Sequence, residues 1–299
     1  MDGITELPEE ATSVCYLIQD NHNDHITIFY PGAMDGKYAK PLPDELFEDT
    51  KLGVITVASR QDNEEFFEKC QKHHVPIVFG MKDDFDAFPE EFLKRLLTGS
   101  KIIFTNEVER EIIEKIYGFE DITELFDIGE VEIIVTTLGK DGSLCYIREG
   151  DIIRQEKIGI CKVDHVVDAT GSGDAYMAGF IYGYLKGYKA EECCRLGGTL
   201  SYFILQSEGC CTNAPTEEQL LEKAKSILSS VWASYFERGE NAIEHIIYGC
   251  GSGNCCKICV VFWRSVESRS CKTVFGKSRK KWRLCESLIH IRELTKESK

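Results

Sequence analysis

The sequence predicts an α/β fold with a mostly parallel central sheet covered by helices on both faces. Between residues 53 and 137, apolar runs of strand length alternate with helical patterns. Repeated β-α units of this kind favour parallel strands, because the helices form the crossover connections. In addition, a glycine-rich run at 168–174 directly precedes an apolar helical pattern. The 299 residues, 43% of them hydrophobic, suffice for one large domain, or for one domain with an appendage.

The first expected elements are two strands at 13–19 and 25–30, which form a hairpin across an Asp- and Asn-rich turn. A break at Tyr30-Pro31-Gly32-Ala33-Met34 follows. The expected strands after it are 53–58, 76–80, 101–104 and 132–137, and the expected helices run through Phe66 to Cys70, 89–97 and 107–117.

A second hairpin is expected at 143–148 and 151–155, across Glu149-Gly150. Helices follow at about 173–186, 190–207 and 217–229, the last with Thr216 as N-cap. Beyond Val231 the alternation stops.

The run Asp168-Ala169-Thr170-Gly171-Ser172-Gly173-Asp174 is the strongest functional signal. Glycines allow a sharp turn, and the unpaired N–H groups of a starting helix attract phosphate. A bound phosphate would repel an aspartate at such an anion site. We therefore expect the aspartate to have a chemical role there, which is to accept the proton of an attacking hydroxyl. The run therefore indicates phosphoryl transfer to an alcohol.

The run has other possible interpretations. A plain strand-to-helix turn with Asp174 as a solvated first-turn acid stays open. A dinucleotide fingerprint needs a third glycine where Tyr176 stands, and Gly171-Ser172-Gly173 lacks the G-x-S-x-G order of a nucleophile elbow.

Two further motifs each follow an expected strand, where ligands gather in open α/β sheets. Asn106-Glu107-Val108-Glu109 opens a helix, and by itself it also fits an N-cap with first-turn acids. Thr137-Leu138-Gly139-Lys140-Asp141-Gly142 also fits a β-turn.

Together, in this order, the three motifs resemble N-x-x-E, T-x-G-x-x-G and D-[TA]-[TA]-G-[AS]-G-D of the ribokinase-like (PfkB) family of sugar and nucleoside kinases. The resemblance covers about residues 11–228. The run Tyr30-Pro31-Gly32-Ala33-Met34 is most similar to that of bacterial adenosine-kinase-like and related sugar kinases of the family. The resemblance implies a ribokinase-like three-layer fold and an ATP-dependent kinase that transfers the γ-phosphate to a primary hydroxyl of a sugar or nucleoside.

The resemblance assigns the catalytic roles. Asp174 would be the general base, and the backbone amides of Gly171, Ser172 and Gly173 would form the anion hole for the γ-phosphate.

The resemblance also implies the cofactors ATP, Mg2+ and K+. Asn106 and Glu109 would organise Mg2+, and Thr137, Gly139 and Gly142 would hold the nucleotide. Asp168 and Thr170, with carbonyls of the Gly209 loop, would bind a monovalent cation such as K+.

The sequence departs from the family at its start, because no Gly-Gly-x-x-x-Asn substrate motif precedes the hairpin. We therefore expect an N-terminally truncated fold with an exposed sheet edge. Either a neighbouring chain completes the site, as in a homodimer, or the chain is a catalytically incomplete nucleotide-binding remnant.

Charge divides the chain unevenly. Residues 251–299 carry 12 Lys and Arg against 4 Asp and Glu, a charge of +8, so the net -15 leaves -23 on the rest. We expect a kinase domain at 1–230 and a basic, Cys-containing tail at 231–299. The acidic balance argues against a general nucleic-acid binder, although the run 277–283 and a separate nucleic-acid function of the tail stay open.

Cysteine usage and hydropathy suggest a cytoplasmic protein without membrane spans. Three adjacent cysteine pairs do not form a bridging framework, and no apolar run approaches the roughly 18 residues of a membrane helix. In the tail, Cys250, Cys255, Cys256 and Cys259 are too crowded for a typical zinc site. The run 271–278 lacks the first glycine of a phosphate-binding loop.

Overall fold

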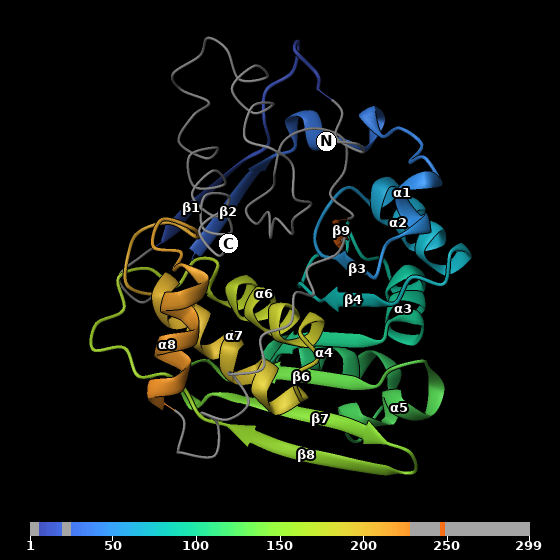
Figure 1. The fold of residues 1–299 in the computed structure, drawn as a ribbon. Helices are drawn as coiled ribbons and strands as arrows, with labels where there is room; N and C mark the ends of the chain where they lie inside the picture. Colours follow the sequence, from blue (N-terminus) through green and yellow to red (C-terminus); the bar gives the residue numbers. More distant parts are fainter. Residues whose placement is uncertain (1–5, 20–24, 228–245, 249–299) are drawn as a thin grey trace. The chain divides into compact units, whose positions relative to one another are not determined.

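The computed structural model describes residues 6–19, 25–227 and 246–248. Figure 1 shows their helices and strands, which divide into two compact units. Unit 1 comprises described residues of 1–136, 146–154 and 245–259, and unit 2 those of 137–145 and 155–244. The predicted domain boundary at 230, the cysteine cluster and the basic run 277–283 lie outside the described residues.

Parallel strands and helices alternate along the middle of the chain, as the sequence predicts. The strands are β3 (Leu52–Ile55), β4 (Ile77–Gly80), β5 (Ile102–Asn106) and β6 (Ile133–Thr137). The helices are α1 (Glu45–Glu48), α2 (Arg60–Lys72), α3 (Glu90–Gly99), α4 (Glu107–Tyr117) and α5 (Leu125–Ile128). Short 3-10 turns lie at Gly32–Met34, Gly36–Tyr38, Ile122–Glu124 and Gly139–Asp141.

The larger sheet has the strand order β8-β7-β6-β5-β4-β3-β9, and β3 pairs in parallel with β4, as β4 does with β5. Every residue of β3 and β4 is buried, which explains why these strands are continuous apolar runs without alternation. The prediction of a mostly parallel α/β sheet is therefore confirmed.

Aromatic side chains fill the core of unit 1. Phe79 of β4 packs edge-on against Phe88, with ring centroids 5.3 Å apart. On α3, Phe92, Leu93, Leu96 and Leu97 are all buried, as expected for the apolar face of an amphipathic helix.

The predicted N-terminal hairpin is present as β1 (Val14–Gln19) and β2 (His25–Tyr30), paired antiparallel with Val14 opposite Tyr30. One of its faces is formed by exposed apolar side chains. They are Val14, Tyr16, Ile18, Ile26, Ile28 and Tyr30.

The C-terminal region contains one strand that the sequence analysis did not predict. Strand β9 (Ile246–Tyr248) pairs in parallel with β3 and stands at the end of the strand order, next to β3. The sequence predicted only that the β-α alternation stops beyond Val231, and a strand of three residues is too short to give a periodic pattern.

The described part of unit 2 includes the α-helices α6 (Ser172–Leu185), α7 (Ala190–Ile204) and α8 (Glu217–Ile227). Helices α6 and α7 lie side by side (Figure 1). Glycines allow this close packing, because a Cβ on Gly179 of α6 would lie 2.6 Å from the carbonyl oxygen of Leu196 and 2.9 Å from the Cα of Gly197.

The second predicted hairpin is β7 (Ser143–Glu149) and β8 (Ile152–Ile158), which are neighbours in the sheet. Gly150, between the two strands, has a φ of 64°, a conformation that glycine adopts at little cost. Among the described helices, none is long and apolar enough to cross a membrane.

Candidate active site

The glycine run forms the start of α6, as predicted. Gly171 is the N-cap, with φ 81° and ψ 0°, and its carbonyl accepts the Ala175 N–H at 2.8 Å. A Cβ at Gly171 would overlap the Cβ of Cys210 and lie 3.1 Å from its Cα. Both the left-handed backbone and this close approach therefore require glycine here.

Asp168 fixes the turn that leads into the helix. Its Oδ1 accepts the Thr170 N–H at 2.8 Å, and its Oδ2 accepts the Gly209 N–H at 3.0 Å. These bonds hold the pKa of the Asp168 carboxyl below its usual value, and the bond from Gly209 has the largest effect. An ionised Asp168 thus ties the helix start to the Gly209 loop.

Asp174 lies in the first turn of α6 and is buried, with 7% of its surface exposed. This is not the solvated first-turn acid of the alternative interpretation. The same turn is held from α7, where the Ser201 hydroxyl donates to the Ser172 carbonyl at 2.7 Å.

The loop from Thr137 to Gly142 closes tightly before β7. The Leu138 N–H donates to the Gly142 carbonyl at 2.8 Å, and the Asp141 N–H to the Leu138 carbonyl at 3.0 Å. Gly139 and Gly142 have φ values of 53° and 93°. A Cβ on Gly142 would overlap the carbonyl oxygen of Ile158, so this glycine is required for packing whether or not the loop binds a nucleotide.

Cys210 also belongs to this region, although no sequence motif points to it. It lies against Gly171, and its thiol is hydrogen-bonded to the thiol of Cys211. A hydrogen bond with Cys211 lowers the pKa of Cys210 to about 6, although burial and the charges of Asp174 and Asp168 oppose this shift. The pKa of Cys211 is raised by the same bond and by burial.

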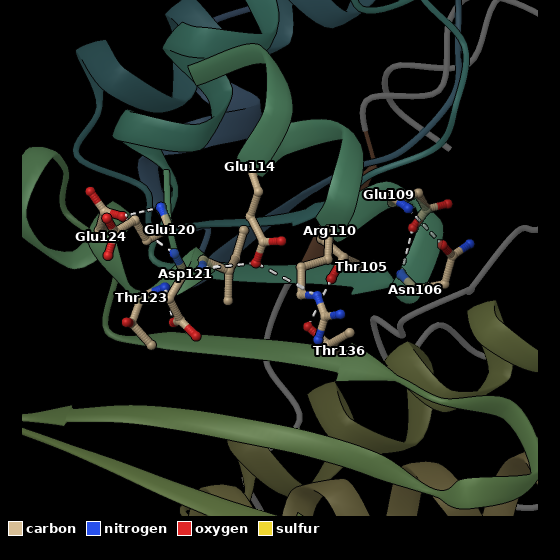
Figure 2. A network of polar contacts seen from close by, with 11 residues as sticks. Thr105, Asn106, Glu109, Arg110, Glu114, Glu120, Asp121, Thr123, Glu124 and Thr136 are labelled. Atoms are coloured by element: carbon tan, nitrogen blue, oxygen red, sulfur yellow. Dashed lines mark hydrogen bonds and ion pairs between the residues drawn. The ribbon is translucent and has the colours of Figure 1, made fainter. Parts of the chain in front are cut away.

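Asn106 and Glu109 form a reciprocal capping box at the start of α4 (Figure 2). The Asn106 Oδ1 accepts the Glu109 N–H at 2.8 Å, and the Glu109 Oε2 accepts the Asn106 N–H at 2.7 Å. The N-cap interpretation is therefore confirmed, which leaves a second role of these side chains as a prediction.

Beneath these residues, two buried hydroxyls join neighbouring strand ends. Thr105 Oγ1 of β5 and Thr136 Oγ1 of β6 lie 3.0 Å apart, next in sequence to Asn106 and Thr137 (Figure 2). On the other side of α4, Glu114 accepts the Ile122 N–H at 3.1 Å and pairs with Arg110 at 3.6 Å. The bond between Glu114 and Ile122 ties α4 to the 3-10 turn Ile122–Glu124.

We expect Asn106→Ala to lower the free energy of unfolding by about 1 kcal/mol, because one cap of the box is lost. Urea denaturation followed by circular dichroism measures it. Glu107→Gln, which changes an exposed first-turn acid outside the box, is the matched control and is expected to cost less than half as much. Equal costs for both changes would contradict the structural role of the box.

The candidate residues fall into two groups. Unit 1 carries Asn106 and Glu109, whereas unit 2 carries the loop from Thr137 to Gly142 and the run from Asp168 to Asp174. Within unit 2, the run is brought together with Gly209 and Cys210. That all three motifs meet at one site stays a prediction.

An α/β sheet with β-α crossovers and a glycine-led helix start defines a class of phosphate-binding proteins. Residues 1–217 match the profile of the pfkB family of carbohydrate kinases, and the chain belongs to this family. It is thus a kinase of the class that acts on sugars or nucleosides.

Individual relatives agree with this family. The chain is similar to a nucleoside kinase of Methanocaldococcus jannaschii, with 30% identity over 218 residues, which are 72% of this chain and 68% of that protein.

Solved structures share the ribokinase-like fold. A Burkholderia thailandensis nucleoside kinase in complex with inosine matches with a TM-score of 0.63 and 24% identity, over 74% of this chain and 70% of that one. An Arabidopsis thaliana ribokinase complexed with ribose and ATP matches with a TM-score of 0.59 and 21% identity, over 73% and 70%. The predicted fold class is confirmed.

Proposed function

We propose that the chain transfers the γ-phosphate of ATP to a primary hydroxyl of a sugar or nucleoside, with adenosine or a ribose-like sugar as the candidate acceptors. The observation that carries this proposal is the start of α6, where a buried carboxylate, Asp174, lies in the first turn of a helix capped by Gly171. The similarity to nucleoside kinases favours a nucleoside over a free sugar.

In this proposal Asp174 accepts the proton of the attacking hydroxyl. The amides of Gly171 and Gly173 would face the transferred phosphoryl group and stabilise its charge, and the Ser172 amide, which donates to the Ala169 carbonyl at 3.2 Å, would join them by exchanging that bond for one to the phosphoryl group. The rigid turn supports this role, since Asp168 holds it through Thr170 and Gly209. Catalysis is then a matter of positioning and electrostatics.

The nucleotide is assigned to the loop that contains Thr137, Gly139 and Gly142. Its internal hydrogen bonds fix the backbone before any ligand arrives, and glycines permit close approach of a ligand. ATP as the phosphate donor follows the family.

Asn106 and Glu109 offer the oxygen ligands that Mg2+ prefers. Because the capping box fixes both side chains at the end of β5, they would hold the ion directly or through water. Bound Mg2+ would supply positive charge beside the triphosphate.

Asp168 and Thr170 are assigned to a monovalent cation such as K+, together with carbonyls of the Gly209 loop. The lowered pKa of Asp168 keeps its carboxylate charged, which fits a cation. Its oxygens accept the N–H groups of Thr170 and Gly209 and a bond from the Thr170 side chain, which leaves a lone pair of the carboxylate for a cation.

The second candidate is a catalytically incomplete, nucleotide-binding remnant of such a kinase. It predicts that the chain binds ATP and transfers phosphate to no acceptor.

Coupled ADP release separates the two hypotheses. The acceptors are adenosine, inosine, cytidine, ribose and fructose, and we expect at least about tenfold higher kcat/KM for one nucleoside than for either sugar. The 5'-deoxy analogue of that nucleoside lacks the primary hydroxyl and is the control, with no acceptor-dependent release. ATP affinity is measured by calorimetry. Measurable ATP binding without turnover on any acceptor would favour the remnant.

A further inference from the structure

Two buried hydroxyls in unit 2 connect the proposed nucleotide loop to the helix that carries the proposed base. The Oγ of Ser143 and the hydroxyl oxygen of Tyr176 lie 2.7 Å apart. Ser143 directly follows Gly142, the last residue of the loop, and Tyr176 lies two residues after Asp174. The bond thus spans two motifs that are far apart in the chain.

Both partners are shielded from water, with 1% of Ser143 and 7% of Tyr176 exposed. A buried hydroxyl that loses its partner cannot turn to solvent, so the bond is costly to break. Burial raises the pKa of Tyr176 well above its usual value, and the nearby Cys194 thiol adds to this. The tyrosine therefore stays protonated and able to hydrogen-bond at all physiological pH values.

The backbone around Tyr176 is held from a second side by α7. A Cβ on Gly197 would lie 2.6 Å from the Tyr176 carbonyl oxygen and 2.9 Å from its ring. Successive helical residues are rotated by about 100°, so Asp174 and Tyr176 project to nearly opposite sides of α6. Tyr176 can therefore anchor the helix without occupying the space in front of Asp174.

We propose that the hydrogen bond between Tyr176 and Ser143 is a positioning link, which keeps the start of α6 at a fixed separation from the loop that ends at Gly142. The proposal rests on the proposed function, in which that loop holds the nucleotide and Asp174 takes the proton. A small shift of Asp174 relative to the bound nucleotide would lower the rate strongly, because reacting groups must keep a near-attack geometry. Tyr176 and Ser143 are thus positioning residues that touch neither substrate nor cofactor.

The test removes one oxygen atom at a time. We expect Tyr176→Phe and Ser143→Ala each to lower kcat about tenfold at saturating ATP and acceptor. The double variant is expected to fall no further than Tyr176→Phe, because that change alone already breaks the bond to Ser143. If one single variant fails to fold, as judged by circular dichroism, the other decides the result.

Tyr182→Phe is the matched control. Tyr182 lies on the same helix, and its hydroxyl donates to Glu217 of α8, away from both motifs in the sequence. A purely structural role would make all three single variants less stable and leave kcat unchanged. A kcat within twofold of the unaltered protein for both Tyr176→Phe and Ser143→Ala, or additive losses in the double variant, would overturn the proposal.

A second readout does not depend on activity. Hydrogen exchange without ligands is expected to quicken at the Leu138, Asp141 and Gly142 amides, which are bonded within the loop, in Tyr176→Phe and not in Tyr182→Phe. An unaltered protein without kinase turnover would contradict the proposed function alone. Unchanged exchange in Tyr176→Phe would contradict the link.

Discussion

Asp174→Asn is expected to lower kcat about 10³-fold, within the range that general-base catalysis contributes. The amide has nearly the shape of the carboxylate but cannot accept the proton of the attacking hydroxyl. Asp174 is buried in the first turn of α6, so a change of similar size should leave the fold intact. Steady-state kinetics with the best nucleoside of the acceptor panel measures the effect.

ATP affinity separates this role from nucleotide binding. Removing a negative charge beside an anion site should leave the Kd for ATP unchanged or lower it, and calorimetry measures this. Asp151→Asn, which alters an exposed acid in the turn between β7 and β8, is the control and should keep kcat within about twofold, as is usual for surface changes away from the chemistry. Asp174→Asn with unreduced turnover would refute the role of base, and a large loss of ATP affinity would assign Asp174 to binding instead.

Local signals predicted most of the fold. The alternation of strands and helices follows from burial, because β3 and β4 are buried at every position and α3 along one face. The helix starts also have local causes. Asn106 and Glu109 form their capping box through residues three apart in the chain, a spacing visible in the sequence.

Contacts between distant residues could not be predicted in this way. Cys210 against Gly171, and Ser143 with Tyr176, join segments whose approach depends on how α6, α7 and the Gly209 loop pack. The Gly-Cys-Cys sequence indicates only a turn. A serine at the start of a strand and a tyrosine in a helix carry no signal of their pairing, since either residue is common in such places.

The contact at Gly171 leads to the second large effect. Gly171→Ala is expected to lower the free energy of unfolding by about 2–4 kcal/mol. A φ of 81° costs a residue with a Cβ roughly 1–2 kcal/mol, and the new methyl group would also overlap the Cβ of Cys210. Because the turn must shift to relieve the overlap, the Ser172 and Gly173 amides move as well. Urea denaturation measures the stability, and calorimetry the expected loss of ATP affinity.

Gly173→Ala, two residues later, is the matched control and should raise the free energy of unfolding instead of lowering it. A Cβ at Gly173 meets no atom within 4 Å, and Gly173 lies inside α6, where alanine is favoured over glycine by about 0.8–1.0 kcal/mol. Adding Cys210→Gly to Gly171→Ala should restore part of the stability, because the overlap is removed while the backbone cost remains. If Gly171→Ala were as stable as the unaltered chain, the left-handed turn at the start of α6 would be wrong, and with it the geometry proposed for the anion hole.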